Sequence, residues 1–162
     1  MADKIVYKPA GVAETFSLDW LKILVPVWEP NRRYNLGDLV RAPVFNGWIF
    51  EADPIASDTW ALSGMTAPEF PFGDAETTVD GAIVWTAKSP AQAGLQTISV
   101  SVWGLDAGIV EDTKTISGFE TFITVSGGVA GEQYRMTNTI TRSTGEEEQD
   151  SLVLEILNPA DV

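Results

Sequence analysis

The sequence predicts an all-β protein: an antiparallel β-sandwich that carries a small aromatic-rich β domain inserted after its first strands. Three observations lead to this prediction. Apolar and polar residues alternate in several short runs, as in strands that bury one face. Glycine-rich turns separate these runs roughly every ten residues. Tryptophan and proline are concentrated in the middle of the chain, where four of the six Trp and six of the nine Pro lie.

Four runs in the second half of the chain are predicted strands, namely residues 97–103, 119–125, 133–141 and 152–157. The alternation in the first run predicts two faces, with Ile98, Val100 and Val102 on one and Ser99 and Ser101 on the other. Turn signals separate these runs, including Ser126-Gly127-Gly128 and Ser143-Thr144-Gly145.

The aromatic middle of the chain has its own predicted hairpin. Asn46-Gly47 is a strong two-residue turn sequence, because both central positions of such a turn need positive φ. It would join residues 38–45 to residues 48–52, with a third strand at residues 83–87. Between residues 53 and 80 the pattern is weak, and we expect an ordered loop that is held by its aromatic side chains, namely Trp60, Phe70 and Phe72.

The first strand, residues 14–24, needs a partner because it is apolar on alternate positions. We expect it to pair with residues 97–103. That pairing predicts a discontinuous sandwich domain, residues 1–24 plus 95–162, and an inserted module of residues 25–94. Two alternatives stay open: the strand belongs to the aromatic middle, or residues 18–25 form a short helix.

Composition excludes several classes of function. The 162 residues include no Cys and no His, so disulfides, thiolate or imidazole metal sites and a Ser-His-Asp triad are excluded. The formal net charge is −13, which disfavours binding to nucleic acid or to a membrane surface. No signal peptide or membrane span is visible in the sequence. From the composition as a whole we expect a soluble acidic protein that is not an enzyme, with no catalytic, cofactor-binding or metal-binding residues.

Residues 28–85 resemble a small aromatic β-module of bacteriophage structural proteins, which is also similar to the chitin-binding modules of chitinases. The resemblance rests on Trp28, Pro30, Tyr34, Gly37-Asp38-Leu39-Val40, Asn46-Gly47-Trp48-Ile49-Phe50-Glu51-Ala52, Pro68-Glu69-Phe70-Pro71 and residues 78–85. The usual Gly-Thr-Ser-Gly stretch after the hairpin is only loosely present. The resemblance implies a carbohydrate-binding-like module, with Trp28, Tyr34, Trp48 and Trp60 as candidate sugar-binding residues. The alternative is that these rings fill the small core.

The remaining residues resemble phage fibre–tail adaptor proteins, also described as neck or tail adaptors. The matching motifs are Phe16-Ser17-Leu18-Asp19-Trp20, Gly94-Leu95-Gln96-Thr97-Ile98 with Trp103, and Ser126-Gly127-Gly128 followed by residues 129–141. The resemblance implies an Ig-like sandwich and a structural protein of the virion neck or tail, made in the host cytoplasm. Its partners would be connector, tail or fibre subunits, and copies would form an oligomeric ring. The alternatives are a host-glycan-binding accessory module and an exposed decoration or fibre protein.

Two sets of carboxylates are considered as candidates, one for a protein-docking patch and one for a catalytic or calcium-binding pair. Glu146, Glu147, Glu148 and Asp150 form an acidic run that is either a solvated face or an electrostatic docking patch for a protein partner. Residues 96–162, where this run lies, hold 11 acidic and 3 basic groups, a net charge of −8. Asp38 and Asp80 each lie beside a glycine, and we interpret each as an acceptor for backbone N–H groups in its own turn rather than as a catalytic or calcium-binding pair.

Overall fold

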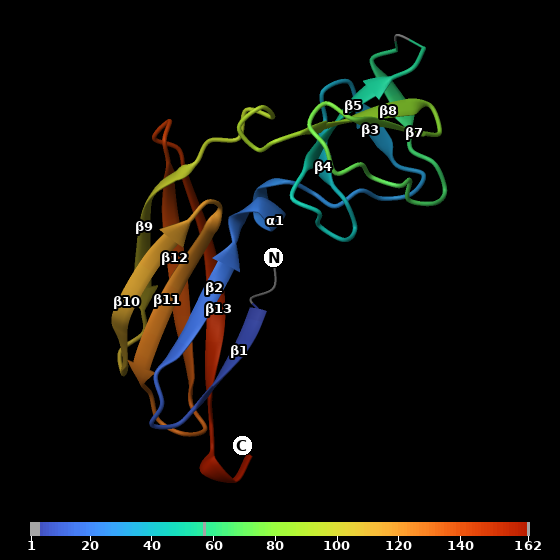
Figure 1. Cartoon of the computed structure of the whole chain (residues 1–162). Coiled ribbons are helices and arrows are strands. Elements are labelled where there is room, and N and C mark those ends of the chain that lie inside the picture. The colour runs from blue at the N-terminus through green and yellow to red at the C-terminus, as the bar shows by residue number, and fades with distance from the viewer. Residues whose placement is uncertain (1–3, 57, 162) are drawn as a thin grey trace. The chain divides into compact units, whose positions relative to one another are not determined.

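The computed structural model describes residues 4–56 and 58–161 and divides the chain into two compact units (Figure 1). Met1–Trp20 and Thr97–Val162 form the first, called here the sandwich unit. Leu21–Gln96 form the second, called here the aromatic unit. Within the described residues, no helix is long and apolar enough to cross a membrane.

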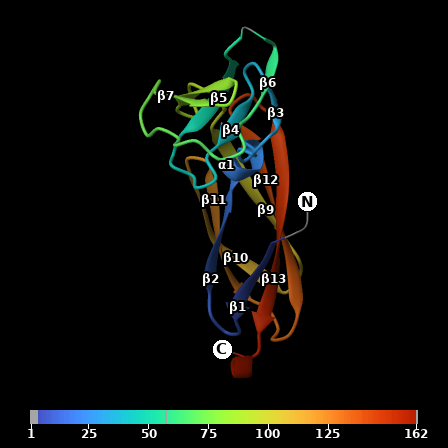
Figure 2. The ribbon, with the colours of Figure 1, turned by 90° about the vertical axis from the view of Figure 1, so that its right-hand side faces the viewer.

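The sandwich unit consists of two sheets. The first has the order β1-β13-β12-β9, from strands β1 (Lys4–Pro9), β13 (Glu147–Leu157), β12 (Gln133–Arg142) and β9 (Ile98–Leu105). The second has the order β10-β11-β2, from strands β10 (Ile109–Ser117), β11 (Glu120–Gly127) and β2 (Glu14–Asp19). The two layers are seen edge-on in Figure 2. The predicted all-β sandwich is therefore confirmed, although β1 pairs with β13 in parallel.

Alternation along the strands builds the core between these two sheets. On β11, Thr121, Ile123 and Val125 are buried, whereas the residues between them are half-buried on the outer face. β12 and β13 alternate in the same way. The buried apolar residues of the unit are Leu18, Trp20, Ile98, Trp103, Ile109, Ile123, Val125, Met136, Ile140, Leu152, Leu154 and Ile156.

The predicted pairing of the first strand with residues 97–103 is wrong. β2 pairs instead with β11, where Phe16 lies opposite Ile123, so β2 and β9 belong to different sheets of the sandwich. The strand is also shorter than predicted, because helix α1 (Trp20–Leu24) follows directly. The Val25 N–H donates to the Leu21 carbonyl at 3.0 Å, which is the i to i−4 hydrogen bond of a helical turn.

The predicted face of β9 is wrong as well. The β9–β12 register shifts after the pair Thr141–Val100, since the next residue of β12 pairs with Ile98. This β-bulge at Ser99 inverts the alternation, because an extra residue moves the following side chains to the opposite face. Consequently Ser101 and Trp103 point into the core, and Val100 and Val102 are 48% and 52% exposed.

Two strands of the sandwich unit had no sequence signal. β1 is a strand in which Lys8 is buried and donates to the Pro9 and Gly127 carbonyls at 3.1 and 3.0 Å. β10 lies at a sheet edge and has few buried residues, so it lacks the alternation that a half-buried strand shows. A short 3₁₀ turn, Pro159–Asp161, follows β13.

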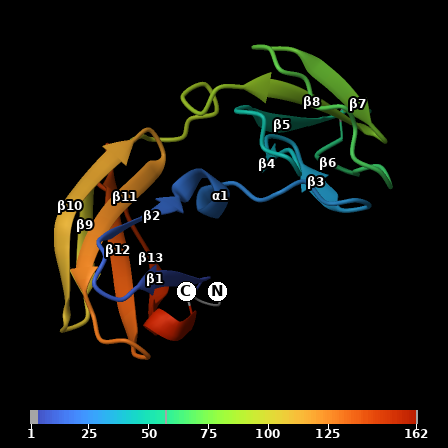
Figure 3. The ribbon, with the colours of Figure 1, turned by 60° about the horizontal axis from the view of Figure 1, so that its bottom comes forward.

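The aromatic unit contains a sheet of order β4-β5-β8-β7 and a separate two-stranded ribbon, β3-β6 (Figure 3). The sheet strands are β4 (Leu39–Arg41), β5 (Ile49–Pro54), β8 (Ile83–Lys88) and β7 (Thr77–Asp80). The ribbon strands are β3 (Arg33–Asn35) and β6 (Trp60–Leu62). The core gathers Trp28, Tyr34, Val40, Ala42, Phe50, Ala52, Ala61, Phe70, Ile83, Trp85 and Ala87.

The predicted hairpin exists, but its two-residue turn does not. Arg41 pairs with Ile49, so seven residues connect β4 and β5. Pro43 cannot donate to a strand ladder, which favours an early end to β4. Asn46 instead shapes the loop with its side chain: Oδ1 accepts from the Trp48 N–H at 3.1 Å, and Nδ2 donates to the Pro71 carbonyl at 3.0 Å.

Residues 53–80 were expected to form a loop that is held by three aromatic side chains. The segment in fact includes β6 and β7. Of the three rings only Phe70 is buried, since Trp60 is 43% exposed and Phe72 is 76% exposed.

Candidate docking surfaces and aromatic site

Asp80 is the polar centre of the aromatic unit. It ends β7 and is 4% exposed. Its Oδ2 accepts from the indole N–H groups of Trp28 and Trp85 at 2.8 and 3.0 Å, and its Oδ1 accepts from the Gly64 N–H at 2.7 Å. Asp80 therefore holds three segments of the module together. Asp38, in contrast, accepts from the Asn35 N–H in its own turn at 2.8 Å.

Two of the four candidate sugar-binding rings lie in this core. Trp28 and Tyr34 are 6% and 4% exposed, which leaves no ring face on which a sugar could stack. Tyr34 packs edge-on against Trp85 with 5.0 Å between ring centroids, and its hydroxyl accepts from the Glu29 N–H at 2.8 Å. Burial raises the pKa of the Tyr34 hydroxyl, and this hydrogen bond opposes the rise.

The other two candidate rings lie nearer the surface. Trp48 is half-buried and packs against the core. Trp60, on β6, is 43% exposed, and the guanidinium of Arg33 lies over its ring at 4.4 Å from the centroid. Trp60 is therefore the candidate whose ring is most open to a ligand, and Arg33 adds a cation–π contact beside it.

Arg32, the residue before Arg33, has a different neighbour. Arg32 donates from Nη1 to the Glu29 carboxylate, and its guanidinium lies 5.8 Å from the Tyr34 ring centroid. The hydrogen bond and charge of Glu29 raise the pKa of Arg32. Of the two adjacent arginines, Arg32 thus binds Glu29 and Arg33 stacks on Trp60.

An open apolar groove lies on the aromatic unit between the β4–β5 loop and residues 67–72, with a volume of about 780 Å³. Sequence reasoning did not identify it. Its walls include three prolines, namely Pro43, Pro68 and Pro71, and the most exposed rims are Val44 and Phe72, at 83% and 76%. The signal that the sequence offered for this groove was a set of apolar residues next to prolines, such as Val44 beside Pro43 and Phe72 beside Pro71.

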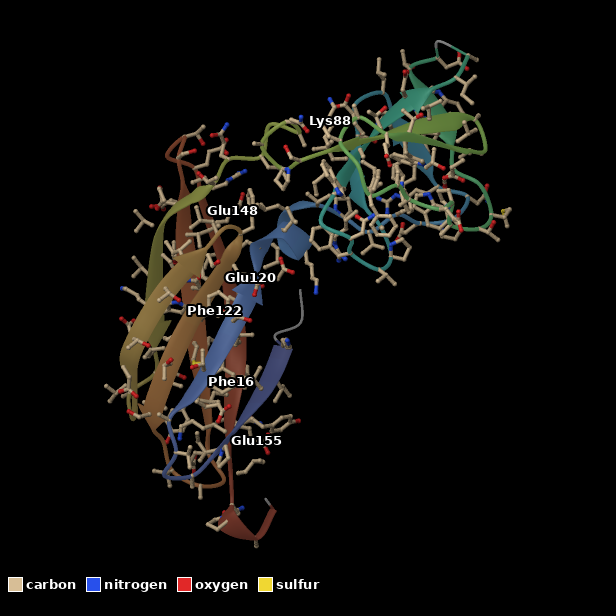
Figure 4. All side chains as sticks on the ribbon, viewed as in Figure 1. Phe16, Lys88, Glu120, Phe122, Glu148 and Glu155 are labelled. Atoms are coloured by element: carbon tan, nitrogen blue, oxygen red, sulfur yellow. The ribbon has the colours of Figure 1, made fainter. Side chains whose placement is uncertain are left out.

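The acidic run lies on the β12–β13 hairpin of the sandwich unit. Arg142, whose side chain is 15% exposed, donates from Nη2 to Glu146 at 2.7 Å and to Glu148 at 3.2 Å. Glu147 is exposed and Asp150 is half-buried. Two of the four candidate docking carboxylates are thus bound to an arginine of their own hairpin, which reduces the negative charge available to a partner. Figure 4 shows Glu148 and Glu155 toward opposite ends of β13.

Phe122 forms a second surface feature that sequence reasoning did not single out. It is half-buried on the outer face of the β10-β11-β2 sheet, opposite Ser17 on one side and Thr115 on the other (Figure 4). Nearby on this face, Thr15 and Thr124 hydroxyls are 2.7 Å apart. Aromatic residues are enriched in protein interfaces, so Phe122 is a candidate anchor for a partner.

The features described so far are surface side chains and buried aromatic rings on a β-sheet framework. Among residues 4–56 and 58–161, no cluster of three or more carboxylates could hold a metal ion. Residues 73–155 match the family model Gp77, podophage GP4 fiber-tail adaptor protein gp77.

The matched residues make up just over half of the chain, so this protein belongs to the family of podophage fibre-tail adaptors. The family is a structural component of the phage virion tail, which implies contact with other virion proteins, and is not known as an enzyme. The match begins within the aromatic unit and extends through most of β13. No curated protein matches the chain.

Proposed function

We propose that this chain links fibres or neck components to the tail or connector of a podophage through protein–protein contacts alone. The match of residues 73–155 to the fibre-tail adaptor family carries the proposal. In it the sandwich unit is the adaptor domain, with an Ig-like fold, and the aromatic unit is an inserted carbohydrate-binding-like module. Copies of the chain are made in the host cytoplasm and form a closed ring in the virion neck or tail.

Two surfaces of the sandwich unit support a docking role. The face around Phe122 offers an aromatic anchor among hydroxyl groups, which suits a well-packed contact. The exposed Glu147, together with the half-buried Asp150, offers negative charge that would steer a basic partner. Together they would combine an energetic anchor with electrostatic orientation.

The test uses phage particles assembled with and without this chain. Without it, we expect particles that keep their tails and lose their fibres, as seen by electron microscopy, and supplying the purified chain with fibres should restore them. Fibres that remain attached without the chain would contradict the proposal. A particle reconstruction would show whether the chain lies between tail and fibre in a ring, as proposed, or on the outside as a decoration protein.

A second candidate function is binding of host glycans by the aromatic unit, favoured by the exposed Trp60 ring with Arg33 over it. We expect chitin or host polysaccharide to retain the chain, and Trp60→Ala to abolish retention. Phe72→Ala is the matched control, because Phe72 is another exposed aromatic side chain of the same unit, at 76%. Equal retention of all three proteins would contradict a site at Trp60.

A further inference from the structure

The groove between the β4–β5 loop and residues 67–72 carries the most exposed apolar side chains of the chain. Val44 and Phe72, at 83% and 76%, are the two most exposed large hydrophobic residues among residues 4–56 and 58–161. Both line the groove. Clustered apolar exposure of this kind marks a place where another molecule binds. The walls of the groove determine which kind of molecule fits.

The groove is rigid before anything binds to it. Phe70 is buried, and its ring centroid lies 4.6 Å from that of Phe50 and 6.5 Å from that of Trp28 in the core. Asn46 Nδ2, on one wall, donates to the Pro71 carbonyl on the other wall at 3.0 Å. Walls that are already ordered lose little conformational freedom on binding, which favours affinity.

The walls suit neither an added strand nor a sugar. Residues 42–46 and 67–72 lie outside the strands, so neither wall offers the row of backbone groups that strand addition uses. The polar side chains that line the groove are Asn46 and Glu69, and Asn46 already bonds to the Trp48 N–H and the Pro71 carbonyl. A sugar would therefore find one carboxylate in place of the convergent polar groups that orient a small ligand.

The lining does suit a proline-rich segment in the polyproline II conformation. Six of the eleven lining residues carry rings, namely Phe45, Phe70, Phe72, Pro43, Pro68 and Pro71. Polyproline II segments dock in grooves that are lined by aromatic rings. They have no internal hydrogen bonds and keep a solvated backbone, so they need no ladder from the walls.

Glu69 adds a charge requirement to the occupant. Its side chain is exposed at the groove, and among the described residues no lysine or arginine pairs with it. A carboxylate without a cation beside an apolar groove favours a partner that brings one. The net charge of −13 adds a long-range attraction for a basic segment and a repulsion for a second acidic copy.

We propose that this groove binds a proline-rich segment of a partner protein, in the polyproline II conformation, with an arginine or lysine next to its prolines. The proline rings pack against Phe45 and Phe72 above the buried Phe70, and the basic side chain pairs with Glu69. The site is distinct from Trp60, which does not line the groove. The proposal goes beyond the adaptor role, because it gives the aromatic unit a peptide ligand.

Fluorescence anisotropy with labelled peptides and the full chain tests the proposal. The probe is an arginine followed by about ten prolines, which span about 31 Å as a polyproline II helix. One control peptide has glutamate in place of the arginine, and the other has alternating glycine and serine in place of the prolines. We expect saturable binding of the probe, weaker binding of the glutamate peptide and no binding of the glycine–serine peptide. Added salt should weaken the probe, because it screens the pair with Glu69.

Three variants locate the site. Phe72→Ala should weaken the probe about tenfold, because an aromatic anchor is lost. Trp60→Ala is the matched control: it removes an exposed ring outside the groove and should leave binding unchanged. Glu69→Lys should reverse the preference, so that the glutamate peptide binds more tightly than the probe. A misfolded protein would not gain this preference, so the reversal does not depend on the stability of Phe72→Ala.

Absence of probe binding would overturn the proposal, as would a glycine–serine peptide that binds equally well or a Phe72→Ala variant that loses no more affinity than Trp60→Ala. An unchanged peptide preference in Glu69→Lys would overturn the role of Glu69. Displacement of the probe by a soluble chitin oligosaccharide would make the groove a sugar site, and self-association that Phe72→Ala abolishes would make it a contact between copies; either contradicts the proposal. The adaptor role is tested separately by attachment of fibres, so failure here leaves it untouched.

Discussion

Both units of this chain bury a hydrogen-bonded polar group at the centre of an apolar core, but they use different groups. In the sandwich unit the group is the neutral amide of Asn138, while the buried ammonium of Lys8 lies where β1 and β11 end. Its Oδ1 accepts from Trp20 Nε1 and Thr121 Oγ1 at 3.1 and 2.7 Å, and its Nδ2 donates to Ser101 Oγ at 2.8 Å. In the aromatic unit the group is the carboxylate of Asp80, which accepts from two indoles and one backbone N–H.

The difference follows from how much regular structure each unit has. Long ladders hold the two sheets of the sandwich, so its amide joins elements that are already ordered. The strands of the aromatic unit are six residues or shorter, and many of its residues lie in loops. A charged acceptor forms stronger hydrogen bonds than a neutral one, and a loop-rich module benefits more from them.

The largest expected effect is that of Asp80→Ala. Removing the carboxylate leaves two buried indole N–H groups and the half-buried Gly64 N–H without this acceptor, so the aromatic unit should lose about 4 kcal/mol of its free energy of unfolding. Hydrogen exchange followed by peptide should show the loss in residues 21–96 and not in the sandwich unit. Asp38→Ala is the control, since it removes one exposed turn contact and should cost about 1 kcal/mol or less. Equal costs for the two variants would contradict the central role of Asp80.

Asn138→Leu should cost the sandwich unit less, about 2 kcal/mol. Leucine fills the space of the amide, and Trp20 Nε1 keeps its hydrogen bond to Thr121 Oγ1 at 3.0 Å. Urea unfolding measures the change. The outward-facing Thr139→Val serves as the control on the same strand. A loss as large as that of Asp80→Ala would contradict the difference between the neutral and the charged centre.

A smaller difference, about 1–2 kcal/mol between two alanine variants, separates packing from backbone strain at two glycines, one in each unit. Gly81 and Gly145 both have positive φ, +59° and +90°. Alanine at position 145 would meet nothing within 4 Å and should cost about 1 kcal/mol from strain alone. At Gly81 a Cβ would lie 3.1 Å from the Gly64 nitrogen and the Leu62 oxygen, so Gly81→Ala should cost about 2–3 kcal/mol. Thermal unfolding measures how far each variant lowers the melting temperature of its own unit relative to the unsubstituted chain. Equal lowering in the two variants would contradict the comparison.

The smallest effect concerns pH and the aromatic unit. Burial raises the pKa of Tyr34 in the folded state, so folding favours the protonated hydroxyl. The resulting stability is fully present below the unfolded pKa of tyrosine, about 10, and is lost as the pH rises through the folded pKa. Tyr34→Phe should therefore flatten the fall in stability between pH 9 and 11, roughly the range around that value. Tyr7→Phe, which changes an exposed tyrosine, should leave the fall as it is in the unsubstituted chain.

Strand identity in the sandwich could be read from the sequence wherever one face is buried and the other is not, as on β11 to β13. β1 and β10 were missed for the opposite reason: neither has the regular alternation that periodicity detects. Of the candidate sugar-binding residues, sequence composition marked the aromatic rings, but it could not separate the buried Trp28 from the exposed Trp60.

Local chemistry in the chain was enough to indicate an all-β, acidic protein, because alternation, glycine turns and charge are properties of neighbouring residues. The adaptor family was indicated separately, by the resemblance of motifs such as Phe16-Ser17-Leu18-Asp19-Trp20. Strand partners, the inverted face of β9 and the buried centre at Asp80 depend on residues that are distant in sequence. A one-residue bulge or a shifted register changes which side chains are exposed without changing composition. Which residues of β9 are exposed is therefore decided by its pairing with β12 in the folded chain.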